Sequence, residues 1–209
     1  HLSGEALESQ VRWWREQLAG APDVLDLPTD RPRPAIQSLR GAHEKLALAA
    51  RIAEGVETFS RQQGVTSFMT LVSLFAALLR RYSHAEDILL GSPIAGRNQT
   101  ETEKLIGLFV NTLVLRAQMA DDPPFAELLE RVRQMTLGAY THQDLPFEKL
   151  VEEIQPERSL AHTPLFQVML VLQNAPVGTL EIPGLTLAPV PVDSGTSRFD
   201  LHLSLTELP

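Results

Sequence analysis

The sequence contains no cysteine, and this absence excludes several kinds of chemistry. Disulfide-stapled scaffolds, zinc sites with thiolate ligands and cysteine nucleophiles all require that residue. A chain of 209 residues without cysteine suits a reducing compartment, so we expect a cytoplasmic protein. With 44% hydrophobic residues, the chain is long enough for one globular unit or for one large lobe of something larger.

The sequence also lacks long apolar runs and an excess of positive charge. No run reaches the ~18 apolar residues that a membrane-crossing helix needs. No basic segment followed by an apolar one opens the chain, so we expect neither a membrane association nor a secretory leader. The net charge is -8, which argues against nucleic acid as a partner because the phosphate backbone attracts basic surfaces.

The common catalytic and metal-binding motifs are missing as well. The six histidines are not spaced as a metal-binding pair, so no metal site is predicted. The sequence has no phosphate-binding loop, no G-x-G-x-x-G and no G-x-S-x-G. It begins His1-Leu2-Ser3-Gly4 without an initiator methionine, which we interpret as an excised fragment behind a tag residue. A complete catalytic constellation is therefore not expected in this chain.

Hydrophobic periodicity predicts a mixed α/β layer structure, with helices flanking a mixed sheet. Residues 22–34 carry four prolines and predict a stiff, extended connector. The helix at 67–81 is apolar almost all round, which is typical of a helix buried in the middle of a domain, and Thr66 is its expected N-cap. We expect helices at 5–18, 51–63, 67–81, 123–140 and 146–154. We expect strands at 44–48, 108–116, 165–173 and 198–208, and a further strand that begins at residue 87 and leads into a Pro/Gly turn.

Two of the strands carry more specific expectations. The last one alternates, with Leu201, Leu203 and Leu205 following Phe199 on the inward face. The strand at 165–173 is apolar throughout and predicts a central position in the sheet. The segment "GSPIAGR" at 91–97 predicts a Pro/Gly turn that ends in Arg97 on the surface.

Two polar features stand out among these elements. Asn111 lies within an apolar strand, so it either anchors a loop or lines a polar cavity. The stretch "HQDLPFE", residues 142–148, offers a histidine, an amide and two carboxylates. We interpret it as the entry to a helix, because Asp144 is placed to cap that helix and Glu148 lies in its first turn, where the helix dipole favours a carboxylate. Catalysis by this stretch is the alternative.

Several of these segments closely resemble motifs of condensation domains from nonribosomal peptide synthetases. The segments occur in the family's order and cover nearly the whole chain, and several motifs in order are far more specific than one alone. They are "DLPTDRPRP" (26–34), "GSPIAGR" (91–97), "IGLFVNTLVLR" (106–116), "HQDLPFEKLVEEI" (142–154), "RSLAHTPLFQVMLVLQN" (158–174) and "SRFDLHLSLTE" (197–207).

The resemblance implies a two-lobed fold similar to chloramphenicol acetyltransferase, with a tunnel between the lobes. Carrier proteins would deliver two thioesters through their phosphopantetheine arms, and the domain would join the two groups by an amide bond. The family's HHxxxDG motif is absent, because no two histidines are adjacent here. The chain therefore resembles the C-terminal lobe (41–209) behind an inter-lobe helix and Pro-rich connector (1–40), and we expect it to be inactive alone. No cofactor is expected to bind it directly.

The resemblance also suggests roles for particular residues. Arg97 would pair with the Asp of HHxxxDG in the other lobe. The tunnel would be bordered by Asn111 and by three residues of the 142–148 stretch, His142, Gln143 and Asp144. Ser197, Arg198 and Asp200 lie in a segment similar to the one that reaches toward the other lobe. The implied partners are the N-terminal lobe of the same domain, donor and acceptor carrier proteins and a neighbouring adenylation domain.

Three alternatives stay open at this point. An epimerisation or heterocyclisation domain would share the fold and differ in the signature motif. A degenerate domain would recruit a partner protein without catalysis. A free-standing acetyltransferase that uses coenzyme A is the third.

Overall fold

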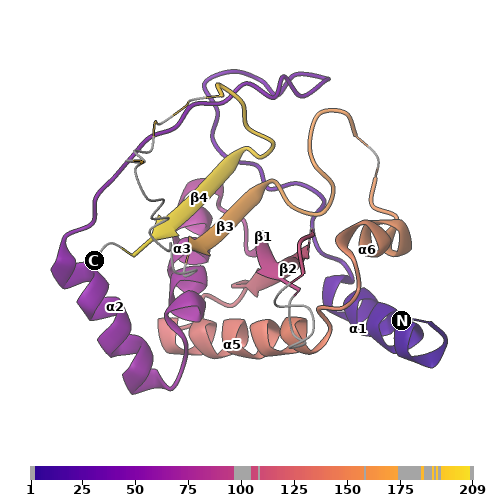
Figure 1. The fold of residues 1–209 in the computed structure, drawn as a ribbon, viewed down its shortest axis with the longest axis horizontal. Coiled ribbons are helices and arrows are strands. Elements are labelled where there is room, and N and C mark those ends of the chain that lie inside the picture. Colours follow the sequence, from indigo (N-terminus) through magenta and orange to yellow (C-terminus); the bar gives the residue numbers. More distant parts are fainter. Residues whose placement is uncertain are drawn as a thin grey trace.

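The computed structural model describes residues 3–96, 105–107, 109–157, 159–173 and 194–207, together with residues 185, 190 and 192. Five helices and four strands are assigned within these ranges (Figure 1). In chain order they are α1 (Glu5–Leu18), α2 (Ala50–Gln63), α3 (Ser67–Ser83), β1 (Asp87–Ala95), β2 (Val110–Gln118), α5 (Phe125–Thr141), α6 (Phe147–Ile154), β3 (Val168–Gln173) and β4 (Leu201–Thr206).

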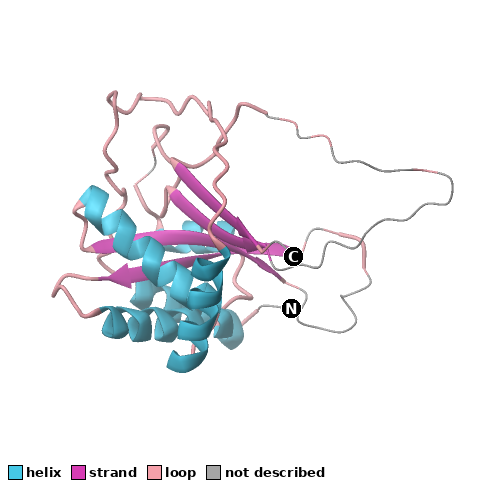
Figure 2. Cartoon of the chain, turned by 90° about the vertical axis from the view of Figure 1, so that its left-hand side faces the viewer, coloured by secondary structure: helices cyan, strands magenta, loops and turns pink. Residues whose placement is uncertain are grey.

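The strands form one mixed sheet in the order β2-β1-β3-β4. β1 and β2 pair antiparallel, whereas β3 runs parallel to both β1 and β4. Helices α3 and α5 pack against β1 and β2 respectively and against each other (Figure 2). This arrangement confirms the predicted mixed sheet with flanking helices, and β3 takes the predicted position inside the sheet.

Local signals placed most of the helix ends correctly. Thr66 caps α3 as predicted, because its hydroxyl accepts a hydrogen bond from the Met69 amide at 3.2 Å. Gly64 ends α2 in the left-handed conformation, with φ 66°, which costs glycine little. The first helix has the predicted bounds and buries Trp14 and Leu18 on its apolar stripe.

The hydrophobic core includes both faces of β1 and β2, because consecutive residues of each strand are buried, and it extends to helices α3 and α5. Ile88, Leu90 and Val114 are fully buried, and α3 contributes Val72 and Ala76, among others. Gly91 allows close packing here, because a Cβ at this position would lie 2.1 Å from the ring of Phe166. The same core includes Trp14 and Leu18 of α1, so it joins this helix to the sheet.

The structure contradicts the expectation that α3 is buried all round. One face of this helix is exposed, with Leu74 at 44%, Leu78 at 49% and Tyr82 at 62%. These residues are spaced four apart and so form one stripe on the side that faces away from the sheet. The apolar composition of α3 therefore predicted burial correctly only for the side that packs against β1 and the neighbouring helices.

Three strand predictions also need correction. Residues 44–48 form no strand, and Leu46 is 87% exposed. The "GSPIAGR" segment is not a turn in its described part, because β1 continues to Ala95 and pairs Pro93 with Thr112. Leu201 is 40% exposed rather than inward, whereas Leu203 and Leu205 pack against the core as predicted.

Among the described residues, no single helix is long and apolar enough to cross a membrane. The bent pair formed by α2 and α3 passes the same test by length and composition alone.

Candidate functional site

Asn111 on β2 ties this strand to the loop that joins α5 to α6. Its Nδ2 donates to the main-chain carbonyls of Gln143, at 2.8 Å, and Leu145, at 2.9 Å. Its Oδ1 accepts from the backbone amides of Phe147, at 3.0 Å, and Thr112, at 2.8 Å. Of the two roles that the sequence left open for Asn111, these contacts match the loop anchor.

The start of α6 differs from the prediction in which residue caps it. Pro146 occupies the N-cap position, and no side chain of that residue can accept from the helix. Asp144 is exposed and does not cap α6, so that prediction is wrong. The Phe147 amide instead reaches Asn111, which lies 36 positions away in sequence. Glu148 does lie in the first turn, where the helix dipole favours a carboxylate.

His142 ends α5 and is held by contacts to α1. Its ring stacks on Trp13, with centroids 4.3 Å apart and planes 2° from parallel. Its Nδ1 lies 2.8 Å from the Gly138 carbonyl, and its own carbonyl accepts from Trp14 Nε1 at 2.9 Å. A Cβ on Gly138 would lie 2.4 Å from the Trp13 ring, so a glycine lets α1 approach this closely. These packing contacts favour the helix-entry interpretation over a catalytic base.

Gln143 has the one buried side-chain acceptor without a recorded hydrogen bond in the described part of this loop. Its Nε2 donates to the Tyr140 carbonyl at 2.7 Å, while its Oε1 is buried without a partner among the described residues. A buried acceptor without a hydrogen bond is costly, so this oxygen has the capacity to bind an N–H group. Burial raises the pKa of the neighbouring Tyr140 phenol.

Arg116 on β2 pins α1 to the sheet, and sequence reasoning missed it. Its Nε and Nη2 form a bidentate pair with Asp87, at 3.0 and 2.6 Å. Its Nη1 donates to the carbonyls of Gln17, at 2.8 Å, and Ala19, at 2.9 Å, at the C-terminal end of α1. A cation at this end also matches the negative pole of the helix dipole. An arginine closing an apolar strand was the available signal.

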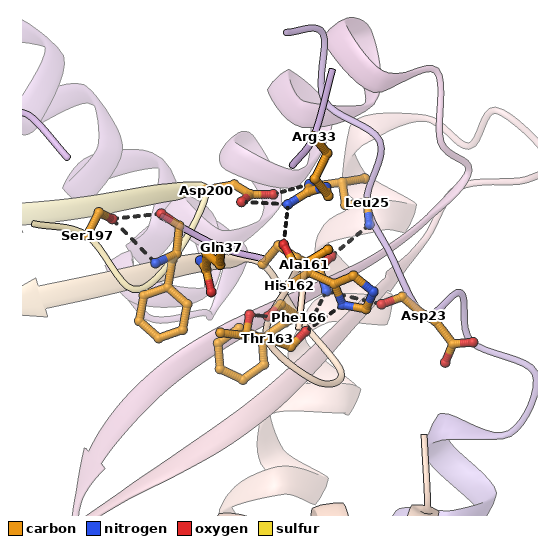
Figure 3. A network of polar contacts seen from close by, with 12 residues as sticks. Asp23, Leu25, Arg33, Gln37, Ala161, His162, Thr163, Phe166, Ser197 and Asp200 are labelled. Carbon is orange, nitrogen blue, oxygen red and sulfur yellow. Dashed lines mark hydrogen bonds and ion pairs between the residues drawn. The ribbon is translucent and has the colours of Figure 1, made fainter. Parts of the chain in front are cut away.

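The connector and the segment before β4 lie side by side (Figure 3). Arg33 forms a bidentate pair with Asp200, of which the Nη1–Oδ1 contact is 3.0 Å. The hydrogen bond to Asp200 raises the pKa of Arg33, which is charged in any case. Gln37 Nε2 donates to the Arg198 carbonyl at 3.0 Å, and the Ser197 amide donates to the Leu39 carbonyl at 2.9 Å.

Ser197, Arg198 and Asp200 thus lie beside the connector, and each has a recorded hydrogen bond to it, while the Asp200 amide also donates to the Gln167 carbonyl. The Ser197 hydroxyl additionally donates to the Phe199 carbonyl at 2.7 Å, and the Arg198 side chain is exposed.

Gln167, at the entrance to β3, is a second residue that sequence reasoning missed. It is 2% exposed, and its Oε1 accepts from the Leu25 amide at 2.8 Å. Its Nε2 donates to the carbonyls of Asp23, at 3.1 Å, and Thr163, at 3.0 Å. A glutamine inside the apolar run "LFQVMLVLQ" was the signal, because a buried amide requires partners.

Arg97, the first candidate for an inter-lobe contact, lies outside the described residues. Two surface grooves are present elsewhere in the described part of the chain, and none of the candidate residues lines either of them. A groove of about 450 Å³ lies between α1 and α5, next to Trp13 and Gln134. A second, of about 660 Å³, lies between the end of α3 and the start of α5, next to Arg81 and Phe125.

Comparison with known proteins defines the class to which this fold and these motifs belong. The family model of the condensation domain matches residues 1–208. One component of the linear gramicidin synthase of Brevibacillus parabrevis is 49% identical over 210 residues, which cover 100% of this chain and 4% of that protein. Malpinin synthetase of Mortierella alpina is 51% identical over 206 residues, covering 99% of this chain and 3% of that protein.

Solved structures agree with the sequence relatives. The X-domain from teicoplanin biosynthesis superposes with a TM-score of 0.90 at 29% identity, covering 99% of this chain and 46% of that chain. The four-domain nonribosomal peptide synthetase AB3403 superposes with a TM-score of 0.89, and at 21% identity it supports the fold alone. It is covered over 17% of its length.

The chain belongs to the condensation-domain family of nonribosomal peptide synthetases, a family of acyltransferases that form peptide bonds. It spans a few per cent of the length of these synthetases and less than half of the solved X-domain chain.

Proposed function

We propose that this chain is the C-terminal lobe (41–209) of an amide-forming condensation domain, preceded by an inter-lobe helix and connector (1–40). In the complete domain it would join a donor acyl or peptidyl thioester to the amine of an acceptor aminoacyl thioester. The observation that carries the proposal is the family match over residues 1–208, combined with coverage of 46% of a solved domain of this fold.

The reaction sets requirements that this lobe would meet in part. The acceptor amine attacks the thioester carbon, a tetrahedral intermediate forms, the amine loses a proton and the donor thiolate leaves on its carrier. The two groups must be held in line and the developing charge must be stabilised. The histidine that positions or deprotonates the amine is expected in the HHxxxDG motif of the N-terminal lobe, so no catalytic residue is assigned to this chain.

The contribution of this lobe would be the opposite wall of the tunnel. Asn111 would hold the loop of residues 143–147 against β2, and Gln143 in that loop would border the tunnel. His142 and Asp144 would border the same tunnel. Arg97 would pair with the Asp of HHxxxDG and fix the motif's loop across the lobes.

The partners follow from the same proposal. The N-terminal lobe of the domain would complete the tunnel, and donor and acceptor carrier proteins would present their substrates on phosphopantetheine arms from opposite ends. A neighbouring adenylation domain would load the acceptor carrier. No cofactor would bind this lobe directly, and the synthetase would work in the cytoplasm.

The test is to assay amide formation from two loaded carrier proteins with three preparations: this chain, the chain joined to its preceding lobe, and that joined protein with Arg97→Ala. We expect no product from the chain alone and product from the joined protein. In the joined protein, Arg97→Ala should destabilise the contact between the lobes and lower the amount of product. In the isolated chain, the same substitution should barely change the melting temperature. Product from the chain alone would contradict the lobe assignment, and a large melting shift in the isolated Arg97→Ala chain would contradict the inter-lobe role.

Recruitment of a partner protein is a second candidate, favoured by one observation. The X-domain superposes in a complex with OxyB, with a TM-score of 0.86 and 30% identity over 97% of this chain. A degenerate HHxxxDG motif in the preceding lobe, with no amide product from the joined protein, would favour this role. An intact motif with an epimerised or cyclised product would instead identify an epimerisation or heterocyclisation domain.

A further inference from the structure

The Pro-rich connector makes contacts to the sheet at two separate places, and these contacts close into a ring. The ring runs from the connector through Gln167, Asp200 and Arg33 back to the connector. The Gln167 side chain binds the connector main chain at Asp23 and Leu25, and its own carbonyl accepts from the Asp200 amide at 2.9 Å. Asp200 in turn binds Arg33 of the connector through both carboxylate oxygens (Figure 3). We call these three residues, Gln167, Asp200 and Arg33, the connector clasp.

Contacts on both sides of the clasp extend the attachment. Arg33 Nη1 also donates to the Ala161 carbonyl, at 3.4 Å, and the backbone amide of Gln37 donates to the Leu160 carbonyl, at 2.8 Å. Further along, the Gly41 amide donates to the Gly195 carbonyl at 2.9 Å. A Cβ on Gly41 would lie 2.6 Å from the Ser197 side chain, so the two segments are in close contact.

The helix that precedes the connector, α1, is also attached to the rest of the fold. Arg116 binds its last carbonyls, Trp14 Nε1 donates to the His142 carbonyl, and Arg15 pairs with Glu153 at 2.8 Å. Leu25, at 5% exposure, continues the same core into the connector. Packing and hydrogen bonding therefore attach residues 5–41 along most of their length.

From these contacts we infer that residues 5–41 form one rigid body with the sheet, and that the connector clasp holds them there. The connector is then not a flexible tether. The two-lobed setting rests on the function proposed above, and within it any swivel between the lobes lies outside residues 5–41. Movement of the preceding lobe would be transmitted to α1 and the sheet rather than absorbed by the prolines.

The inference is testable on this chain by double electron–electron resonance, and the absence of cysteine simplifies the labelling. Nitroxides are attached after Asp30→Cys, in the exposed middle of the connector, and Ala126→Cys, on an exposed position of α5. We expect a single narrow distance distribution. Gln167→Met, which keeps the buried volume and removes the amide, and Arg33→Ala should each broaden it at least twofold.

Arg31→Ala is the matched control, because it removes a charge from the same connector at an exposed position outside the clasp. It should leave the distribution unchanged. A broad distribution in the parent pair, or one that neither Gln167→Met nor Arg33→Ala alters, would overturn the inference. Arg33→Ala changes a surface pair, so it keeps the test valid if Gln167→Met fails to fold. The measurement needs no catalysis, so a failed amide assay with a narrow distribution would reject the proposed function alone.

Discussion

Replacing Asn111 by alanine is the sharpest test of how the 142–148 stretch is built. The substitution removes three hydrogen bonds that cross from β2 to the loop, namely those to the Gln143 and Leu145 carbonyls and from the Phe147 amide. At about 1 kcal/mol net for each bond, the free energy of unfolding should fall by ~3 kcal/mol. For a chain of this size that loss corresponds to a drop of roughly 6–12 °C in melting temperature.

The assay is reversible urea unfolding followed by tryptophan fluorescence. The chain has two tryptophans, and both report on this region because Trp13 stacks on His142 and Trp14 donates to its carbonyl. Asp144→Ala is the control: it should change stability by less than ~0.5 kcal/mol, since this exposed carboxylate caps no helix. A loss below ~1 kcal/mol for Asn111→Ala, or a larger loss for Asp144→Ala, would show that the loop is held in another way.

Three further outcomes follow from the same structure. Arg116→Lys should lower the unfolding free energy by about 2 kcal/mol, because a point charge cannot bind Asp87 and the end of α1 together, and near-ultraviolet circular dichroism of Trp14 should weaken. Gly138→Ala should cost about 1–3 kcal/mol by colliding with Trp13, whereas Gly55→Ala, in open space on α2, should stabilise the chain by ~0.5–1 kcal/mol in urea unfolding. Burial, with a smaller effect of His43, lowers the pKa of His202 below 6.5. The contribution of the neutral His202 to the free energy of unfolding should therefore be full above pH 6.5 and decline as the pH falls below it. Equal slopes of unfolding free energy against pH for the parent chain and His202→Gln would contradict this.

Several features could be predicted because their causes lie within a few residues of one another. The five helices follow from apolar spacing of three and four residues, and the Thr66 cap and the Gly64 stop act on amides and carbonyls of the adjacent turn. The strands after residue 86 follow in the same way from β-forming residues. The condensation-domain motifs identified the family from the sequence alone, and the family model then confirmed it.

The errors arose where a local pattern competed with a distant partner. Pro93 predicted a turn, yet β1 continues past it, paired with β2 as far as Ala95. The described pairing of β1 with β3 is at Gly91, before Pro93, so the amide that proline lacks removes no hydrogen bond to β3 there. Residues 44–48 have a strand composition but pair with no strand among the described residues, so they form no regular element and are exposed. On α3 the sequence shows hydrophobicity on all sides, and only the packed neighbours decide which side is covered.

The sequence by itself determined most of the elements, the family and the expectation that the catalytic histidine lies elsewhere. Tertiary structure alone decided which polar side chains act together. Asn111 reaches a loop 32 to 36 positions away, Gln167 reaches Leu25 across 142 positions, and Arg33 reaches Asp200 across 167. Periodicity and capping depend on neighbours within about four residues, whereas these hydrogen bonds depend on which segments the sheet brings together. That is why "HQDLPFE" could be recognised as a signature, while its anchor on β2 emerged from the fold.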